Sequence, residues 1–464
     1  MARRLAEGCE ARFATYVEEL GSVIGHADRV APLEAYCTGL LLPCERKSVE
    51  PMAAVMAPAR VSAQHQSMLH FISQGGWSDE KVLDKVREIV LPQMVRHGPI
   101  EAWIIDDTGL PKQGKHSVGV ARQYCGQLGK QDNCQVAVTL SLANHHASLP
   151  VAYRLYLPKE WADNEERRCK AGVPDDITFK TKPEIALEQV HGAIEAGLPR
   201  GTVLMDAGYG ASTELRASVA ALELPYVAGI LPNTSVWAAG EEPLPPKKWS
   251  GRGRPAKRIR RDAGHQPTSV KHLALNLPSS ARRKITWREG AAASLSSRFA
   301  RVRVRVAHGD YTLTESRSEE WLLIEWPKGE AEPTKYWLST LPEDISFHRL
   351  VDYAKLRWRI ERDYLELKQE VGLGDFEGRG WRGFHHHATM SIAVYGFLIS
   401  ERGAFPPSAI AKALFPELAL PEGYRPRGSA AAAWAPRSEF HRYSAAAADY
   451  RARRQALALP VLLR

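Results

Sequence analysis

The stretch PIEAWIIDDTG, residues 99–109, marks the point where the sequence changes from a helical to a strand pattern. Before it, residues 1–95 contain apolar residues at helical spacing, broken by proline and glycine, with Ser78 as a helix N-cap. Within it, an apolar run ends in two acidic residues and a turn, which is typical of a buried strand followed by a loop. The chain is therefore predicted to begin with a helical domain and to continue into an α/β domain.

The segments that follow alternate between strand and helix patterns. We predict strands at NCQVAVTLSLAN (133–144), LPVAYRLYLP (149–158), TVLMD (202–206, ending in Asp206) and PYVAGIL (225–231), and helices at KPEIALEQVHGAIEAG (182–197) and STELRASVAALE (212–223). Together with the first strand, the order is βββαβαβ, which predicts a mixed α/β layer. This order, followed by a late helix, is that of the ribonuclease-H-like fold.

Regular spacing stops after this core and resumes about one hundred residues later. Short strands such as RVRVRVA and EWLLIEW indicate a β-rich insertion, after which TKYWLSTL and the helix LRWRIERDYLELKQEVGLGDF (356–376) continue the α/β pattern. The predicted domains are an N-terminal helical, DNA-binding domain (1–95), a ribonuclease-H-like catalytic core (96–232 and 336–402), a β-rich insertion domain (233–335) and a C-terminal tail (403–464).

Composition limits the class of protein. The chain has 464 residues, a hydrophobic share of 44% and a formal net charge of +9, which favours an acidic partner such as nucleic acid. No apolar run approaches the ~20 residues of a membrane span. The six cysteines are scattered and form no CxxC pair, so we expect neither a zinc site nor a disulfide framework, and a reducing cytoplasm fits. The family resemblance described below implies that this cytoplasmic protein is associated with the bacterial nucleoid.

Three acidic positions are expected to meet at one edge of such a core. They are Asp106 or Asp107 at the end of the first strand, Asp206 at the end of the fourth, and Glu361 in the late helix. Carboxylate oxygens favour Mg²⁺ or Mn²⁺, and two such ions can activate a water and stabilise a leaving 3′ oxygen. The alternative for each acid alone is a helix cap or turn residue.

The helix at 356–376 also carries a polar stripe. Tyr353, Arg357, Glu361, Tyr364 and Lys368 are spaced by three and four, so they share one face of a helix. One interpretation is a solvated surface with an i,i+4 ion pair. The other is a metal-binding carboxylate flanked by groups that hold a polyanion, and the partner acids elsewhere favour the second.

These residues carry a family resemblance. The segments IDDTGLPKQGKHSVGVARQYCGQLGK, LYLPKEW, DAGYG and RWRIERDYLELKQEVGLGDFEGRGWRGFHHHA, in that order, resemble bacterial insertion-sequence transposases of the DDE superfamily. In particular, they look like the cut-and-paste group with a Y-R-E-K signature and a β-rich insertion. The resemblance implies that Asp106, Asp206 and Glu361 are catalytic, with Asp107 as a second candidate for the first acid. It further implies that Arg357, Lys368 and, with a spacing one residue too long, Tyr353 contact DNA.

The insertion contains a strongly basic run. KKWSGRGRPAKRIRR, residues 247–261, holds eight Lys or Arg and no acid, which predicts phosphate contacts rather than a solvated linker. The basic residues that we expect to bind DNA are Arg252, Arg254, Lys257, Arg258, Arg260 and Arg261. In related transposases an insertion-domain Trp stacks on a flipped base, and Trp287 has the most basic surroundings. For His385, His386 and His387, consecutive positions argue against a shared metal, so we expect a structural or DNA-contact role.

The sequence thus predicts a DNA transposase that cleaves its element's inverted-repeat ends and transfers the 3′-OH strand to target DNA. It would use two Mg²⁺ or Mn²⁺ ions and act as a homodimer on paired ends of double-stranded DNA, with no membrane partner. The alternatives are a transposase-derived DNA-binding protein that has lost cleavage and a stand-alone metal nuclease of the same fold.

Overall fold

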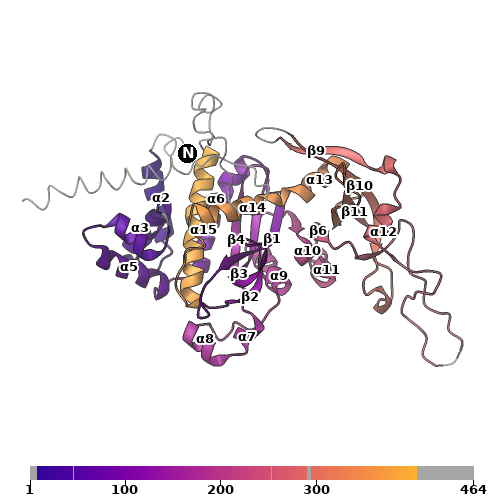
Figure 1. Ribbon diagram of the computed structural model, residues 1–464, viewed down its shortest axis with the longest axis horizontal. Helices are drawn as coiled ribbons and strands as arrows, with labels where there is room; N and C mark the ends of the chain where they lie inside the picture. Colours follow the sequence, from indigo (N-terminus) through magenta and orange to yellow (C-terminus); the bar gives the residue numbers. More distant parts are fainter. Residues whose placement is uncertain (1–7, 45, 252, 290–293, 405–464) are drawn as a thin grey trace, which may run out of the picture. The chain divides into compact units, whose positions relative to one another are not determined.

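The computed structural model describes residues 8–44, 46–251, 253–289 and 294–404 (Figure 1). The chain divides into two compact units, of which the first comprises residues up to 100, 107–193 and from 359 on. The second comprises residues 101–106 and 194–358. Strand β1 (Ala102–Pro111) therefore gives its first half to the second unit and its second half to the first. Within the described ranges, no helix combines the length and the apolar character needed to cross a membrane.

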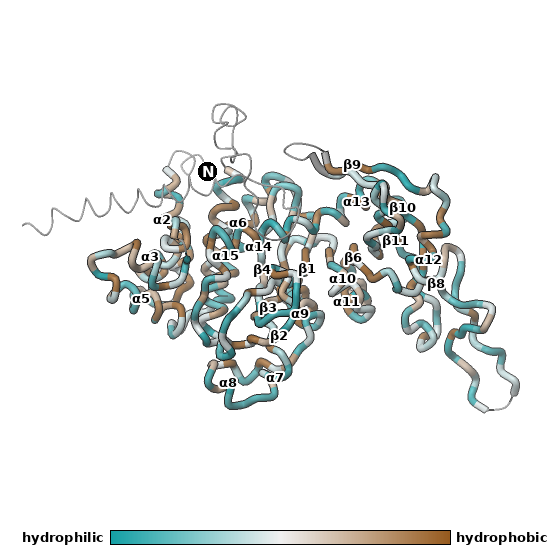
Figure 2. Tube along the Cα trace, in the orientation of Figure 1, coloured by the Kyte–Doolittle hydropathy of each residue, from teal (hydrophilic) through white to brown (hydrophobic). Residues whose placement is uncertain are grey.

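Helix α15 (Trp381–Ala404) is the centre of the first unit. It is buried along nearly its whole length, and it packs against α6 (Asp79–Arg96), the helices before α6 and strand β4. Figure 2 shows apolar residues along α15, as expected of a helix that is covered on all sides. Helix α6 begins at the predicted cap, where the Ser78 hydroxyl accepts the Lys81 backbone N–H. The other helices of this unit are α2 (Cys9–Gly21), a 3-10 turn (Ala27–Arg29), α3 (Val30–Leu41), α4 (Val49–Met56), α5 (Val61–Ser73), α7 (Lys159–Ala162), α8 (Glu165–Ala171), α9 (Lys182–Glu195) and α14 (Trp358–Gln369).

The strands of the first unit form an antiparallel meander. Strand β3 (Lys130–Ala143) pairs with β2 (Ala121–Cys125) through residues 130–134 and with β4 (Ser148–Leu155) through residues 137–143, and it also neighbours β1. Ten consecutive residues of β3 are buried, from Cys134 to its end. Helix α14 is tied to β3 by a hydrogen bond between the hydroxyls of Thr139 and Tyr364.

The second unit contains the parallel strands. The first half of β1 pairs in parallel with β5 (Thr202–Met205), and β5 pairs in parallel with β6 (Tyr226–Ile230). Strand β12 (Lys335–Ser339) then joins β6 antiparallel and is followed by β11, β10, β7 and β8, with β9 on β10. The remaining elements are α10 (Ala207–Gly210), α11 (Thr213–Ala221), β7 (Ser235–Trp237), β8 (Thr268–Ser269), α12 (Val270–Leu275), a 3-10 turn (Ser279–Ala281), β9 (Arg283–Glu289), β10 (Ser294–Val306), a 3-10 turn (Asp310–Thr312), β11 (Glu320–Glu325) and α13 (Phe347–Leu356).

The predicted mixed α/β class is confirmed, and every strand and helix predicted between residues 99 and 231 is present. One prediction was wrong, because residues 356–376 are not one helix. Helix α13 ends at Leu356, Arg357 follows as its C-cap, and α14 ends at Gln369. Beyond it, Gly372 has φ +77°, a left-handed conformation that ends helices. The N-terminal domain, the insertion domain and their boundaries remain predictions.

Candidate functional site

Two of the predicted acids lie close in sequence to the parallel pairing of β1 with β5. Asp106 is inside β1, which was predicted to end at its acids but continues to Pro111, and Asp206 directly follows β5. The pairing aligns Ala102 with Thr202 and Ile104 with Leu204. Continued by two residues, the same register would set Asp106 opposite Asp206, and residues that are opposite in parallel strands present their side chains to the same face of a sheet. That the two carboxylates act together stays a prediction.

Asp206 is held in position by its own backbone. Its carboxylate Oδ1 accepts the N–H groups of Gly208 (2.9 Å) and Tyr209 (3.1 Å), so it caps the one-turn helix α10. That helix lies close against β6, because a Cβ on Gly210 would stand 2.1 Å from the Gly229 carbonyl oxygen. Asp206 therefore does cap a helix, as the alternative interpretation of this acid predicted. Both capping bonds are accepted by Oδ1, and neither involves Oδ2.

The two adjacent acids of β1, Asp106 and Asp107, each pair with a different cationic side chain. The Arg357 guanidinium donates to the Asp106 carboxylate at 2.7 Å, and both residues belong to the second unit. The Lys182 ammonium donates to Asp107 at 2.9 Å within the first unit. Lys182 was not anticipated as a partner, and no sequence signal connects it with a residue 75 positions earlier. Neighbouring residues of a strand direct their side chains to opposite faces, which explains why Asp106 and Asp107 pair with different side chains.

Glu361 lies in the first turn of α14 and is exposed, in the first unit. In the described part of the chain, no three His, Cys, Asp or Glu side chains gather closely enough to hold a metal ion. Because Glu361 and the pair Asp106–Asp206 belong to different units, their convergence stays a prediction. The donor set itself fits a divalent cation, since all three candidates supply the carboxylate oxygens that Mg²⁺ and Mn²⁺ prefer.

The remaining residues of the polar stripe have partners within their own units. The Lys368 ammonium donates to the Gly109 carbonyl oxygen at 2.9 Å, at the end of β1. Tyr353 accepts a hydrogen bond from Arg349, whose guanidinium also covers the tyrosine ring at 4.6 Å. Lys368 is therefore directed to the strand that carries the first acid, whereas Tyr353 is engaged by its neighbour on α13.

The basic run is divided between exposed and anchored residues. Arg261 pairs with the buried Asp310 and lies 5.9 Å from the Trp237 ring centroid, so it is anchored in the fold. Arg260 is half-buried and pairs with Asp262 at 3.5 Å. Arg252 lies outside the described residues. The predicted DNA contacts that are exposed are Arg254, Lys257 and Arg258.

Neutralising Arg254, Lys257 and Arg258 to Gln should weaken binding to every DNA sequence. For each phosphate that is no longer neutralised by a cationic side chain, the slope of log K against log salt should fall by about 0.9. Titrations of duplex DNA at several salt concentrations measure this slope. The matched control neutralises three exposed lysines on α6, α7 and α8: Lys81, Lys159 and Lys170. Equal slopes for the two triple variants would show that the run has no special role in DNA binding.

The structure offers a second aromatic candidate besides Trp287. The Trp287 ring is half-buried, with Phe299 against it edge-on at 5.7 Å and the Lys355 ammonium 4.5 Å from its centroid. Trp249, inside the basic run, is 59% exposed, and its indole N–H donates to the Gly253 carbonyl oxygen. A stacking residue needs an open ring face, which favours Trp249. Its position between two lysines and the GRGR sequence was the signal that sequence reasoning passed over.

The three consecutive histidines are structural. All are buried, and the His386 ring stacks on Trp77 at 3.6 Å while both of its nitrogens face backbone carbonyl oxygens. His387 contacts the Tyr36 hydroxyl and the Gly372 carbonyl oxygen. Burial lowers the pKa of His386 and of His387 to about 4. The expectation that they share no metal is consistent with these separate partners.

Comparisons with known proteins agree with this geometry. Residues 19–294 match the family described as DDE superfamily endonuclease. A probable transposase for insertion sequence element IS701, from Microchaete diplosiphon, is 31% identical to the chain over 212 residues. That alignment covers 46% of this chain and 51% of the relative, so the chain spans about half the length of the curated relative it matches. Asp106 and Asp206 lie inside the family match, and Glu361 lies beyond its end.

Proposed function

The chain belongs to the DDE endonuclease superfamily, and from this premise we propose that it is a DNA transposase of an insertion sequence. In this proposal it cleaves DNA at the ends of the element and joins the freed 3′-OH to target DNA. The observation that supports the proposal is the parallel pairing of β1 with β5, whose register, continued by two residues, would set Asp106 opposite Asp206. The relative named above is itself described as a transposase for an insertion sequence.

The neighbour relations of the strands support the ribonuclease-H-like core. Strand β4 pairs with β3, β3 neighbours β1, β1 pairs with β5, and β5 pairs with β6. Strands β4, β3 and β1 are thus consecutive neighbours, and β5 and β6 are parallel additions on the other side of β1. This order supports a site in which the first acid, inside β1, and the second acid, directly after β5, act together.

The proposed site residues have separate tasks. Asp106, Asp206 and Glu361 would hold the divalent metal, with Asp107 kept apart by Lys182. When bound, the metal would lower the pKa of a water and stabilise the charge on the leaving oxygen. In cleavage the water oxygen forms a bond to phosphorus and the 3′ oxygen leaves with a proton. In joining, that 3′-OH attacks a target phosphodiester and the target's own 3′ oxygen leaves.

Arg357 would change partner when DNA is present. In the structure the Arg357 guanidinium forms an ion pair with the Asp106 carboxylate and balances its negative charge. A metal on Asp106 would compete with this ion pair and free the guanidinium for a DNA phosphate. Lys368, directed toward the end of β1, would contact a second phosphate. The dimer on paired ends is part of the same proposal, since synapsis requires two sites.

One assay tests the proposed function against its two rivals. Supercoiled target DNA and a labelled DNA end from the element's flanking inverted repeat are incubated with the protein and Mg²⁺. A transposase nicks the end and joins it to the target. Nicking without joining would indicate a stand-alone nuclease, and end binding with neither reaction would indicate a DNA-binding protein that has lost cleavage.

Arg357→Ala and Lys368→Ala should each weaken the paired-end complex by about 1–3 kcal/mol, the range for hydrogen bonds to charged groups. Gel shifts in Ca²⁺, which prevents cleavage, measure complex formation. Arg46→Ala is the matched control, because Arg46 is exposed, is not part of the polar stripe and pairs with Glu377 at 2.6 Å. If both test variants form as much complex as the wild type and keep its melting temperature, the polar stripe is a solvated surface and does not bind DNA.

A further inference from the structure

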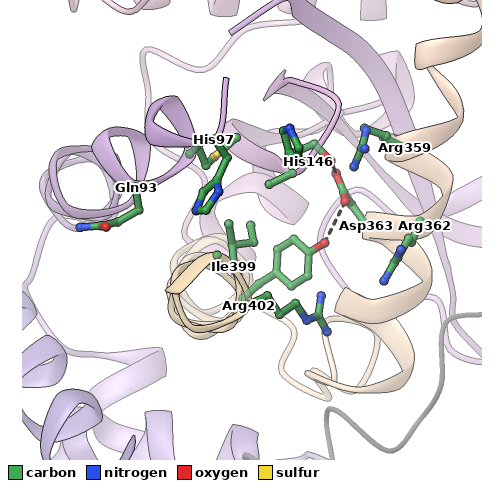
Figure 3. A pocket seen from close by; sticks show the side chains of 13 residues that line it. Gln93, His97, His146, Arg359, Arg362, Asp363, Ile399 and Arg402 are labelled. Carbon is green, nitrogen blue, oxygen red and sulfur yellow. Dashed lines mark hydrogen bonds between the residues drawn. The ribbon is translucent and has the colours of Figure 1, made fainter. Parts of the chain in front are cut away.

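A second polar site lies within the first unit, apart from the proposed catalytic acids. It is a cavity of about 210 Å³ lined by residues of α6, the β3–β4 turn, α14 and α15 (Figure 3). Three arginines and two histidines line it: Arg359, Arg362, Arg402, His97 and His146. Figure 3 shows these side chains around Asp363, with Ile399 as an apolar wall. The buried Tyr395 also lines the cavity and donates its hydroxyl to Asp363 at 2.8 Å.

The cavity lies on the side of α14 that faces away from Glu361. Arg359 and Asp363 are four residues apart and therefore share one face of the helix. Glu361 is two residues from each of them, which turns it by about 200° at 100° per residue. Burial agrees with this geometry, since Asp363 is 3% exposed and Glu361 is exposed. A ligand in the cavity would thus be bound behind the helix that carries the proposed third acid.

Two of the arginines are held by one carboxylate. Glu366 accepts hydrogen bonds from Arg362 Nε (3.0 Å) and from Arg402 Nη1 (2.6 Å). The two oxygens of Asp363 accept from the hydroxyls of Ser148 and Tyr395. The lining of the cavity includes three arginines but only one acidic residue, Asp363, so it carries an excess of positive charge.

This combination fits one class of ligand. Guanidinium groups bind phosphate oxygens through paired, charge-assisted hydrogen bonds, and the two imidazole rings add further donors. The apolar wall formed by Met94 and Ile399 would lie against a sugar or a base. We propose that the cavity binds a phosphate ester, presented either by a strand of DNA or by a free nucleotide. The DNA source rests on the proposed function, whereas the free nucleotide does not.

Thermal unfolding of the full chain tests the phosphate site directly. Inorganic phosphate and deoxyadenosine monophosphate, at constant ionic strength against chloride, should raise the melting temperature in a saturable way. Arg359→Gln and Arg362→Gln should raise the half-saturating concentration about tenfold, as loss of one charge-assisted hydrogen bond implies. Arg154→Gln is the matched control, since Arg154 pairs with Glu188 in the same unit and does not line the cavity.

Two further measurements distinguish the loss of a phosphate contact from the loss of folding. Arg362→Lys retains the charge, so it should recover part of the phosphate response if Arg362→Gln loses it by removing a contact. The melting temperature without phosphate shows whether each variant is folded, and Arg402→Gln replaces any that is not. Equal stabilisation by chloride, or an equal response of the Arg359, Arg362 and Arg154 variants, would overturn the phosphate site.

A DNA titration distinguishes the two sources. If the ligand is DNA, Arg359→Gln should lower the salt slope of duplex binding by about 0.9 relative to Arg154→Gln, and phosphate should compete. If the slope is unchanged while the phosphate response is lost, the ligand is a free nucleotide. A wild-type protein that takes up phosphate but neither cuts nor joins DNA would overturn the proposed transposase and leave this site standing.

Discussion

Asp206→Asn and Asp106→Asn should each lower the rate of DNA-end cleavage by at least about a thousandfold, the scale on which an essential catalytic group acts. Each change removes one negative charge from the proposed metal site, either inside β1 or directly after β5. Asparagine is the better replacement, because it caps helices as well as aspartate does. It would keep the bonds from Asp206 to Gly208 and Tyr209, so α10 should stay folded. Single-turnover cleavage of a labelled DNA end in Mg²⁺ measures the rate.

Asp107→Asn is the internal control for this experiment. Asp107 pairs with Lys182 and follows Asp106 directly in the strand, so its side chain is directed to the other face. Its loss should cost less than about tenfold in rate, while DNA binding stays near wild type in all three variants because phosphate contacts carry most affinity. A larger loss for Asp107→Asn than for Asp106→Asn would transfer the catalytic role to Asp107.

The elements that could be predicted from the sequence are those with a clear local pattern of apolar and polar residues. The apolar runs of β1 and β5 could be located because buried strands have a strong signature. The prediction that the first strand ends at its acids was wrong, since β1 continues to Pro111. Strand β2 was not predicted, because it lacks a buried apolar run. Its residues Ala121–Cys125 alternate in exposure and include two polar side chains. It is a strand because it pairs with β3, and that long-range contact leaves no trace in five residues.

The candidate site could be predicted in its residues but not in its partners. The spacing from Arg357 to Glu361 suggested an i,i+4 pair on one helix, whereas the structure interrupts the helix at Arg357 and directs that side chain to Asp106. The ion pair of Arg261 with Asp310 also joins residues far apart in sequence, at 49 positions, against 251 for Arg357 and Asp106. Ion pairs of this kind are decided by tertiary packing, so composition alone made the whole basic run look like a DNA surface.

Glu361→Gln should abolish cleavage as completely as the aspartate variants, although Glu361 belongs to the other compact unit. The three carboxylates are expected to bind the same metal, and removal of any one ligand leaves the others unable to hold it in the required geometry. The matched control is Glu377→Gln, an exposed acid of the same unit that pairs with Arg46. This control should cleave at the wild-type rate.

The convergence of the acids can be measured without cleavage of DNA. Fe²⁺ is bound in place of Mg²⁺, and peroxide with ascorbate then generates hydroxyl radicals that cut the polypeptide beside the metal. One shared site predicts protein fragments that end near Asp106, near Asp206 and near Glu361 in the wild-type complex with DNA. All three cuts should fade together in Glu361→Gln and persist in Glu377→Gln. Cuts confined to the ends of β1 and β5, with near-normal cleavage by Glu361→Gln, would mean that the two aspartates hold the metal with a different third ligand.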